Sequence, residues 1–148
     1  MSKASLGKSS RDYSRGQHTV EFTLILPLLI AFVGAATDWG LPLFVSHVAQ
    51  NAVREGARTA VTRLAVNLAA IKAEVNSKIP DTSLFSDFRN NNNIGVSCAM
   101  VGGTPYITVQ TSGTFNFFFL RVIGFTNIPI ARISTMRYER GLACPVIT

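Results

Sequence analysis

The chain of 148 residues has little charge and few of the side chains on which most enzymes depend. Only 15% of its residues are charged, and histidine and cysteine occur twice each. It contains no C-x-x-C pair, no H-x-x-x-H pair, no P-loop and no dinucleotide fingerprint, which are the usual signs of zinc and nucleotide sites. We therefore expect no metal, no cofactor and no small-molecule substrate.

The nearest approach to a catalytic motif is Gly95-Val96-Ser97-Cys98-Ala99, which lacks the last glycine of the G-x-S-x-G turn of hydrolases. In that fold the acid and the histidine follow the nucleophilic serine along the chain. Both histidines, His18 and His47, precede Ser97. We therefore do not expect the protein to be an enzyme.

The excess of basic residues does not predict nucleic-acid binding, because half of the excess lies in the first tenth of the chain. Fourteen Lys and Arg against eight Asp and Glu give a formal net charge of +6. Residues 1–16 hold one acidic residue, Asp12, and four basic ones, Lys3, Lys8, Arg11 and Arg15. A basic segment before an apolar run is a membrane-topology signal. We expect membrane lipid, and no nucleic acid, as a partner.

An uncharged apolar run from Phe22 to Thr37 follows, bracketed by Glu21 and Asp38. These carboxylates are seventeen positions apart, or about 25 Å along a helix, which is close to the roughly 30 Å of a bilayer core. Trp39 suits the membrane interface, where amphipathic rings gather. A membrane helix over about 20–45 is favoured over a buried core helix of a soluble protein, because no other long apolar helix could cover it.

The Lys and Arg count places the basic segment in the cytoplasm and the chain beyond about Ala49 outside. A cleaved secretory signal is the rival interpretation, with Ala35-Ala36 as its candidate cleavage site.

A different kind of processing is indicated by the residues around Gly16. The basic leader, residues 1–16, ends in glycine, four residues follow, and Glu21-Phe22 opens the apolar helix. This pattern resembles a type IVb prepilin. The resemblance implies that a prepilin peptidase cuts between Gly16 and Gln17 on the cytoplasmic side, so that the helix is retained, and that Glu21-Phe22 serves recognition and assembly.

Cleavage would also give Glu21 a partner. An acidic side chain in a membrane helix costs about 2.5–3.5 kcal/mol at the bilayer centre, so it needs compensation. The new α-amino group of Gln17 has an ordinary pKa of about 8 and is mostly cationic at neutral pH. Glu21 would pair with that group on a neighbouring subunit and fix the axial register. The alternative is a Glu21 that merely lies at the interface.

Two later segments narrow the resemblance. Asp38-Trp39-Gly40 after the apolar run, and Asn-Ala-Val-Arg-Glu-Gly-Ala-Arg at 51–58, resemble the TadE-like minor pilins of tight-adherence (Tad/Flp) pilus systems, as does the ending 133–139. The family implies a minor pilin or pseudopilin needed for pilus assembly and adhesion. Its partners would be other pilins and the inner-membrane assembly platform. The alternative is a single-span, membrane-anchored extracytoplasmic binding domain.

The resemblance also implies a location. The protein would lie in the bacterial inner membrane as a single span, with its N-terminus cytoplasmic and its C-terminal domain periplasmic or extracellular. Incorporation into the pilus would follow.

Beyond the membrane the hydrophobic pattern becomes amphipathic. Apolar residues from Ala57 to Val75 recur every three or four positions, which predicts one helix over 17–78, amphipathic from 50 to 78 and ending before Pro80. Residues 79–93 are polar and contain four consecutive asparagines, which indicates a linker.

Residues 94–148 alternate with period two and predict an antiparallel sheet of three or four strands, with Gly102-Gly103 in a hairpin turn. Residues 115–119, Phe-Asn-Phe-Phe-Phe, indicate either a third strand or a short buried helix reaching Ile123. So small a sheet needs a helix to cover one face. The fold class is therefore α+β: a long N-terminal transmembrane and amphipathic helix packed on a small, pilin-like antiparallel sheet.

Cys98 and Cys144 both fall on the predicted outside, where an oxidising compartment permits a disulfide. They are 46 positions apart, and closing that loop would contribute about 4 kcal/mol in the chain-entropy model. Two free buried thiols are the alternative.

Overall fold

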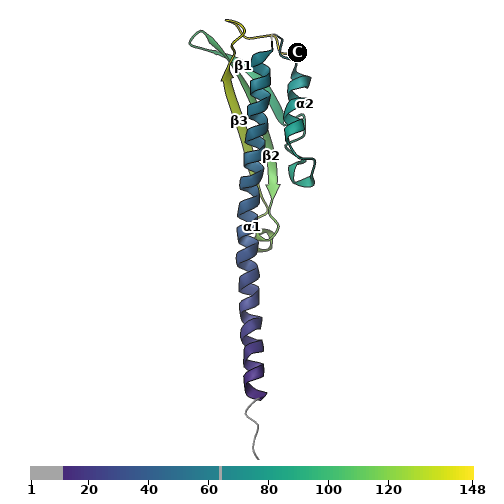
Figure 1. The fold of residues 1–148 in the computed structure, drawn as a ribbon, viewed down its shortest axis with the longest axis vertical. Coiled ribbons are helices and arrows are strands. Elements are labelled where there is room, and N and C mark those ends of the chain that lie inside the picture. Colours follow the sequence, from purple (N-terminus) through teal and green to yellow (C-terminus); the bar gives the residue numbers. More distant parts are fainter. Residues whose placement is uncertain (1–11, 64) are drawn as a thin grey trace, which may run out of the picture.

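The structure, a computed structural model, describes the backbone of residues 12–63 and 65–148 and the side chains from His18 onward, apart from residue 64. A long helix, α1 (Asp12–Thr62), carries the other elements on its C-terminal half, while its N-terminal half projects alone (Figure 1). Those elements are α2 (Leu68–Lys78), β1 (Ile94–Val101), β2 (Thr104–Asn116) and β3 (Asn127–Arg137), with short 3-10 turns η1 (Ser83–Phe85) and η2 (Leu120–Ile123). The α+β class predicted from the sequence is confirmed.

The projecting half of α1 is exposed all round. Every side chain from His18 to Val33 is exposed, and in the described residues His18–Thr62 is the one helix long and apolar enough to cross a membrane. Pro27 and Pro42 both lie inside α1, and the helix continues through both positions. We call residues 20–33 the exposed stem.

The C-terminal half of α1 is the centre of the core. Its small and β-branched residues repeat every three or four positions on one face, and those fully buried include Val45, Ala49, Ala52, Val53, Ala57 and Ala60. Small side chains let the sheet and α2 approach the helix axis closely. The amphipathic face therefore packs on its own domain.

The expected single helix over 17–78 is wrong, because α1 ends at Thr62 and α2 begins at Leu68. Asn67 caps α2 by accepting a hydrogen bond from the Ala70 amide at 3.0 Å. The second helix then runs back beside the first (Figure 1). The spacing of apolar residues does not distinguish one continuous helix from two packed helices. The apolar faces on either side of the break, which include Ala57 and Ile71, are buried in the same core.

The two helices meet at Gly56. A Cβ atom at that position would lie 2.5 Å from Cγ2 of Val75, which is too close for two carbon atoms. Glycine is therefore needed at this crossing for steric reasons.

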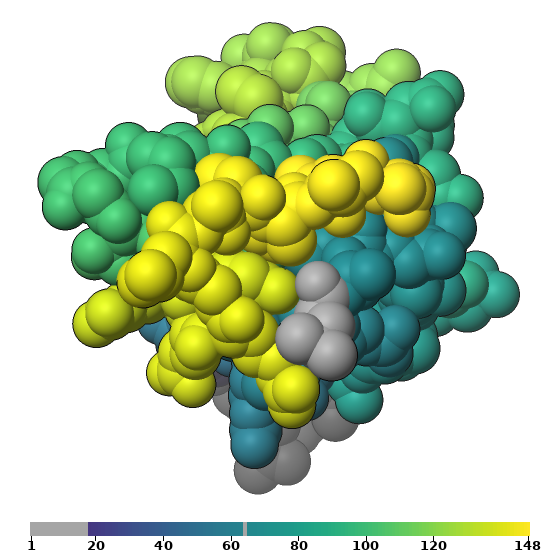
Figure 2. Space-filling view, turned by 90° about the horizontal axis from the view of Figure 1, so that it is seen from above, coloured from purple at the N-terminus to yellow at the C-terminus, as the bar shows by residue number. Residues whose placement is uncertain are grey.

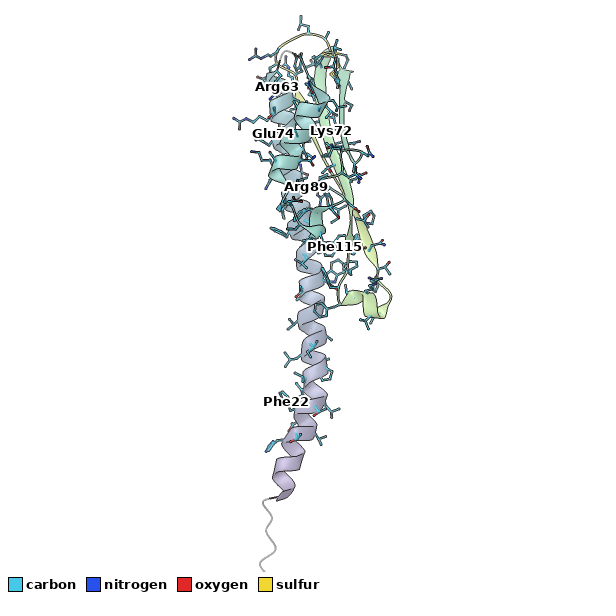
Figure 3. All side chains as sticks on the ribbon, turned by 90° about the vertical axis from the view of Figure 1, so that its right-hand side faces the viewer. Phe22, Arg63, Lys72, Glu74, Arg89 and Phe115 are labelled. Atoms are coloured by element: carbon cyan, nitrogen blue, oxygen red, sulfur yellow. A yellow bond between two sulfur atoms is a disulfide. The ribbon has the colours of Figure 1, made fainter. Side chains whose placement is uncertain are left out.

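In the described residues the strands form one antiparallel sheet of three strands in the order β1-β2-β3. The β1–β2 hairpin turns at Gly102 and Gly103, whose φ angles of 57° and 78° suit glycine. Alternate residues of β2 face α1 and are buried, namely Ile107, Val109, Thr111 and Phe115. Phe115 lies between sheet and helix in Figure 3.

Residues 115–119 are neither a separate strand nor a buried helix. The strand β2 continues to Asn116, and the chain then forms η2, which has no buried residue. The third strand of the sheet is β3, whose pairing with β2 runs from Asn116↔Asn127 to Tyr106↔Arg137.

Residues 79–93, expected to be a linker, also contribute to the core. Phe85 and Phe88 are almost fully buried, and a Cβ at Gly113 would lie 2.7 Å from the Phe88 ring. The polar composition of the segment concealed these two aromatic anchors. The surface pair Glu74–Lys78 on α2 is present at 3.4 Å, as its i,i+4 spacing predicts.

The C-terminal segment closes the far end of the domain. Thr148 exchanges backbone hydrogen bonds with the turn between the helices, donating to Val66 at 3.1 Å and accepting from Leu68 at 2.7 Å. In Figure 2 this segment, in yellow, crosses the end of the domain beside the teal helices. The Cys98–Cys144 disulfide is present, with its Cα atoms 5.8 Å apart, and ties the segment to β1.

Candidate functional site

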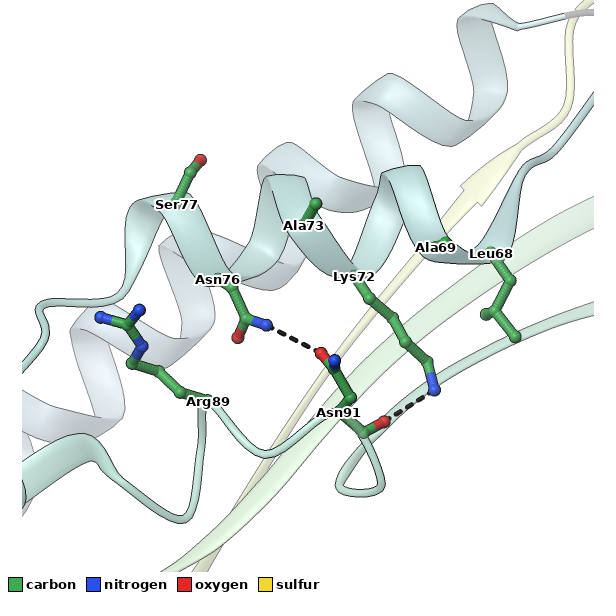
Figure 4. Close-up of a pocket in the computed structure, with 8 residues that line it drawn as sticks. All are labelled: Leu68, Ala69, Lys72, Ala73, Asn76, Ser77, Arg89 and Asn91. Carbon is green, nitrogen blue, oxygen red and sulfur yellow. Dashed lines mark hydrogen bonds between the residues drawn. The ribbon is translucent and has the colours of Figure 1, made fainter.

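A surface hollow of about 640 Å³ between α2 and the 89–91 segment has a structural explanation (Figure 4). Lys72 Nζ donates to the Asn91 carbonyl at 2.7 Å, and Asn76 Nδ2 donates to Asn91 Oδ1 at 2.8 Å. Arg89 pairs with Asp81 at 3.1 Å. The polar groups thus hold the 89–91 segment against α2. Across the described residues, moreover, no three His, Cys, Asp or Glu side chains gather to hold a metal.

The residues predicted to matter for processing lie on the projecting half of α1. The backbone is helical through Gly16 and Gln17, and the side chain of Gln17 lies outside the described part of the chain. Glu21 and Phe22 are on the exposed stem, and Phe22 is 63% exposed (Figure 3). Among the described residues, Glu21 has no ion-pair partner. Its pairing with an α-amino group stays a prediction.

A buried carboxylate with three hydrogen-bond donors lies at Asp38. Its carboxylate is fully buried although it lies at the end of the apolar run. Oδ1 accepts a hydrogen bond from the amide of Phe118 at 3.0 Å, and Oδ2 accepts from those of Phe119 at 2.7 Å and Leu120 at 2.6 Å. We call this set of contacts the Asp38 latch. It satisfies a buried charge that would otherwise be costly.

The position next to the latch on α1 is Gly34, one helical turn earlier and therefore on the same face. A Cβ atom at Gly34 would lie 2.6 Å from Cγ of Phe119, so the loop approaches the helix backbone here. Trp39 is 61% exposed, and its ring centroid lies 6.3 Å from that of Phe117. The interface position predicted for Asp38 and Trp39 stays a prediction.

Farther along α1, polar contacts attach the helix to β3. Arg132 Nε donates to Ser46 Oγ at 2.8 Å, and Gln50 Nε2 donates to the Ile133 carbonyl at 3.2 Å. The Arg132 guanidinium makes a second contact with the same oxygen through Nη2. The domain is therefore fixed on α1 from Asp38 onward.

Sequence reasoning did not predict the partner of Asp38. The available signal was a single carboxylate beside an apolar run, which needs hydrogen-bond donors, together with the unusual density of aromatic residues at 115–119. Neither feature states which of the 148 residues supplies the donors.

The segment that contains Glu21, Asp38 and Gly56 can be compared with known proteins. Residues 16–58 match the family model of TadE-like proteins. The resemblance to the TadE-like family is thus confirmed over this segment, which begins at Gly16 and ends at Arg58. No curated protein and no solved structure matches the chain. The TadE-like segment covers the exposed stem, Asp38 and most of the core-forming half of α1, but none of the sheet.

Proposed function

We propose that the protein is a minor pilin or pseudopilin of a tight-adherence type IVb pilus, needed for pilus assembly and adhesion. The observation that carries the proposal is the exposed stem within the TadE-like segment. Its apolar side chains are exposed on all sides, and a surface of this kind is not stable in water. Lipid covers the stem before assembly, and neighbouring pilin helices cover it in the filament.

The arrangement of α1 suits insertion, processing and lateral packing in that order. The stem crosses the inner membrane with the basic leader in the cytoplasm and the domain outside. The prepilin peptidase removes residues 1–16 and exposes the α-amino group of Gln17. Glu21 on a neighbouring subunit then neutralises that amine, while Phe22, exposed beside it, packs between stems. The assembly platform and other pilins are the partners.

Processing separates this proposal from a simple membrane anchor, which has no use for a new N-terminus. Gly16→Leu should leave a membrane-bound precursor that retains its sixteen leader residues, because the bulky side chain blocks the peptidase site. Gly7→Leu, another glycine of the same leader, is the matched control and should be processed normally. N-terminal sequencing and intact mass measure both. A wild-type protein that begins at Met1 would contradict the proposal.

A further inference from the structure

The loop between β2 and β3 is apolar on its outer side. Residues 117–125 have the sequence Phe-Phe-Phe-Leu-Arg-Val-Ile-Gly-Phe, with Arg121 as the only charged residue. Four large side chains of this loop are more than half exposed: Phe118, Val122, Ile123 and Phe125. Val122, at 88%, is as exposed as any large apolar residue of the described chain. An exposed apolar surface of this extent on nine consecutive residues indicates a contact with lipid or with another apolar surface.

The loop lies where the membrane is expected to end. A hydrocarbon core of about 30 Å takes about 20 helical residues, which extends from Val20 at the start of the exposed stem to Trp39. The loop contacts α1 at Gly34 and Asp38, inside the last two turns of that length. In Figures 1 and 3 it hangs from the sheet toward the projecting half of the helix. The exposed apolar surface of the loop therefore continues that of the stem.

Most backbone amides of the loop have hydrogen-bond acceptors within the protein and do not need water. Seven of the nine amides from 117 to 125 donate to acceptors within the chain: three to Asp38, and the others to the backbone carbonyls of Thr126, Phe119, Arg121 and Leu120. Irregular backbone in hydrocarbon is tolerated only when its polar groups have such internal partners. The loop thus directs three of its amides to the Asp38 carboxylate on its inner side and exposes apolar side chains on its outer side.

We propose that the 117–125 loop is a second membrane contact, which inserts its apolar side chains into the outer boundary of the bilayer beside the protein's own helix. Lipid is the occupant, because the loop is continuous with a stem that lipid covers at the same level. Arg121 is placed to extend its long side chain to anionic phosphate groups. This inference rests on the membrane span of the proposed function and adds that the domain is held against the surface.

Lipid-depth quenching of tryptophan fluorescence tests the loop directly. Trp39 is the only tryptophan and is exposed, so Trp39→Phe gives a silent full-length background. In that background we would place one tryptophan by Val122→Trp in the loop or by Leu142→Trp at the opposite end of the domain. Both positions are 88% exposed, which makes them a matched pair. Leu24→Trp, on the stem, reports the span itself.

The proteins are reconstituted in phosphatidylcholine–phosphatidylglycerol vesicles that contain lipids brominated either near the headgroup end or near the methyl end of the acyl chain. We expect Val122→Trp to be quenched several-fold more strongly than Leu142→Trp, and mainly by the shallow bromine. Leu24→Trp, which lies within the 20–39 span, should also be quenched. Intact mass without reductant checks that each variant retains its disulfide, and circular dichroism checks that it is folded.

Equal quenching at Val122→Trp and Leu142→Trp, with Leu24→Trp still quenched, would overturn the loop contact and leave the span intact. Loss of quenching at Leu24→Trp would overturn both. A Val122→Cys variant that forms disulfide-linked dimers in the same vesicles, without quenching of Val122→Trp, would assign the loop to a second copy of the chain and overturn the lipid proposal.

Discussion

Oδ2 of Asp38 lies 2.6 Å from the amide nitrogen of Leu120, a residue 82 positions later in the chain. This contact joins the end of the apolar run to the tip of the sheet domain. It supplies hydrogen-bond donors to a buried carboxylate that would otherwise have none from the apolar residues around it. The Asp38 latch therefore helps to fix the position of the domain on α1, together with the contacts that Ser46 and Gln50 make with β3.

Asp38→Asn should open the 117–125 loop. The amide has one acceptor oxygen in place of two and turns a donor toward other donors, which costs about 3 kcal/mol. At about 1.4 kcal/mol per decade, amides 118–120 should exchange hydrogen roughly a hundredfold faster. Hydrogen exchange read by mass spectrometry measures this.

The matched control for the latch is Asp87→Asn. Asp87 is exposed and accepts one hydrogen bond from the Thr114 amide, at 3.3 Å. Its loss should change exchange at 118–120 very little. Equal effects of the two substitutions on exchange at 118–120 would show that the Asp38 latch does not stabilise the loop.

Gly56→Ala should destabilise the domain by about 1–3 kcal/mol, because the new methyl group overlaps Val75 and forces α2 away from α1. Gly40→Ala, also inside α1, meets nothing within 4 Å and should be neutral or stabilising, since alanine favours helix. Thermal unfolding in detergent micelles compares the two. An unchanged midpoint for Gly56→Ala would mean that the helices do not cross as closely as the structure has them.

The Cys98–Cys144 disulfide predicts a specific labelling pattern. Alkylation of the unfolded, unreduced protein should modify no cysteine, and alkylation after reduction should modify two. Replacing both by serine should lower the free energy of unfolding by about 4 kcal/mol, the chain-entropy value for a loop of this length. Two modified cysteines in the unreduced sample would show that the bond is absent.

Glu21→Gln should be processed like the wild type but be absent from sheared pili, because the amide keeps the size of the side chain and loses the charge that pairs with Gln17. Glu74→Gln is the control, since its pair with Lys78 at the surface contributes at most about 1 kcal/mol. Immunoblots of sheared filaments measure incorporation. Wild-type amounts of Glu21→Gln in pili would remove its pairing role.

Much of the architecture follows from local patterns in the sequence. The exposed stem, the alternating strands and the Gly102-Gly103 hairpin each depend on neighbours within a few positions, which periodicity detects. The break between α1 and α2 escaped because the apolar spacing continues across it, although Asn67 offered a capping signal. The latch could not be predicted, because hydrogen bonds between residues 80 to 82 positions apart leave no local pattern.

The close contact at Gly34 has a consequence for assembly geometry. The 117–125 loop occupies one face of α1 just above the exposed stem. If two stems met along that face, the loop would hold them apart at the height of Gly34. Helices that packed side by side would therefore have to diverge above Gly34 or pack through the face opposite the loop. The loop thus restricts which face of α1 is available to a neighbouring helix.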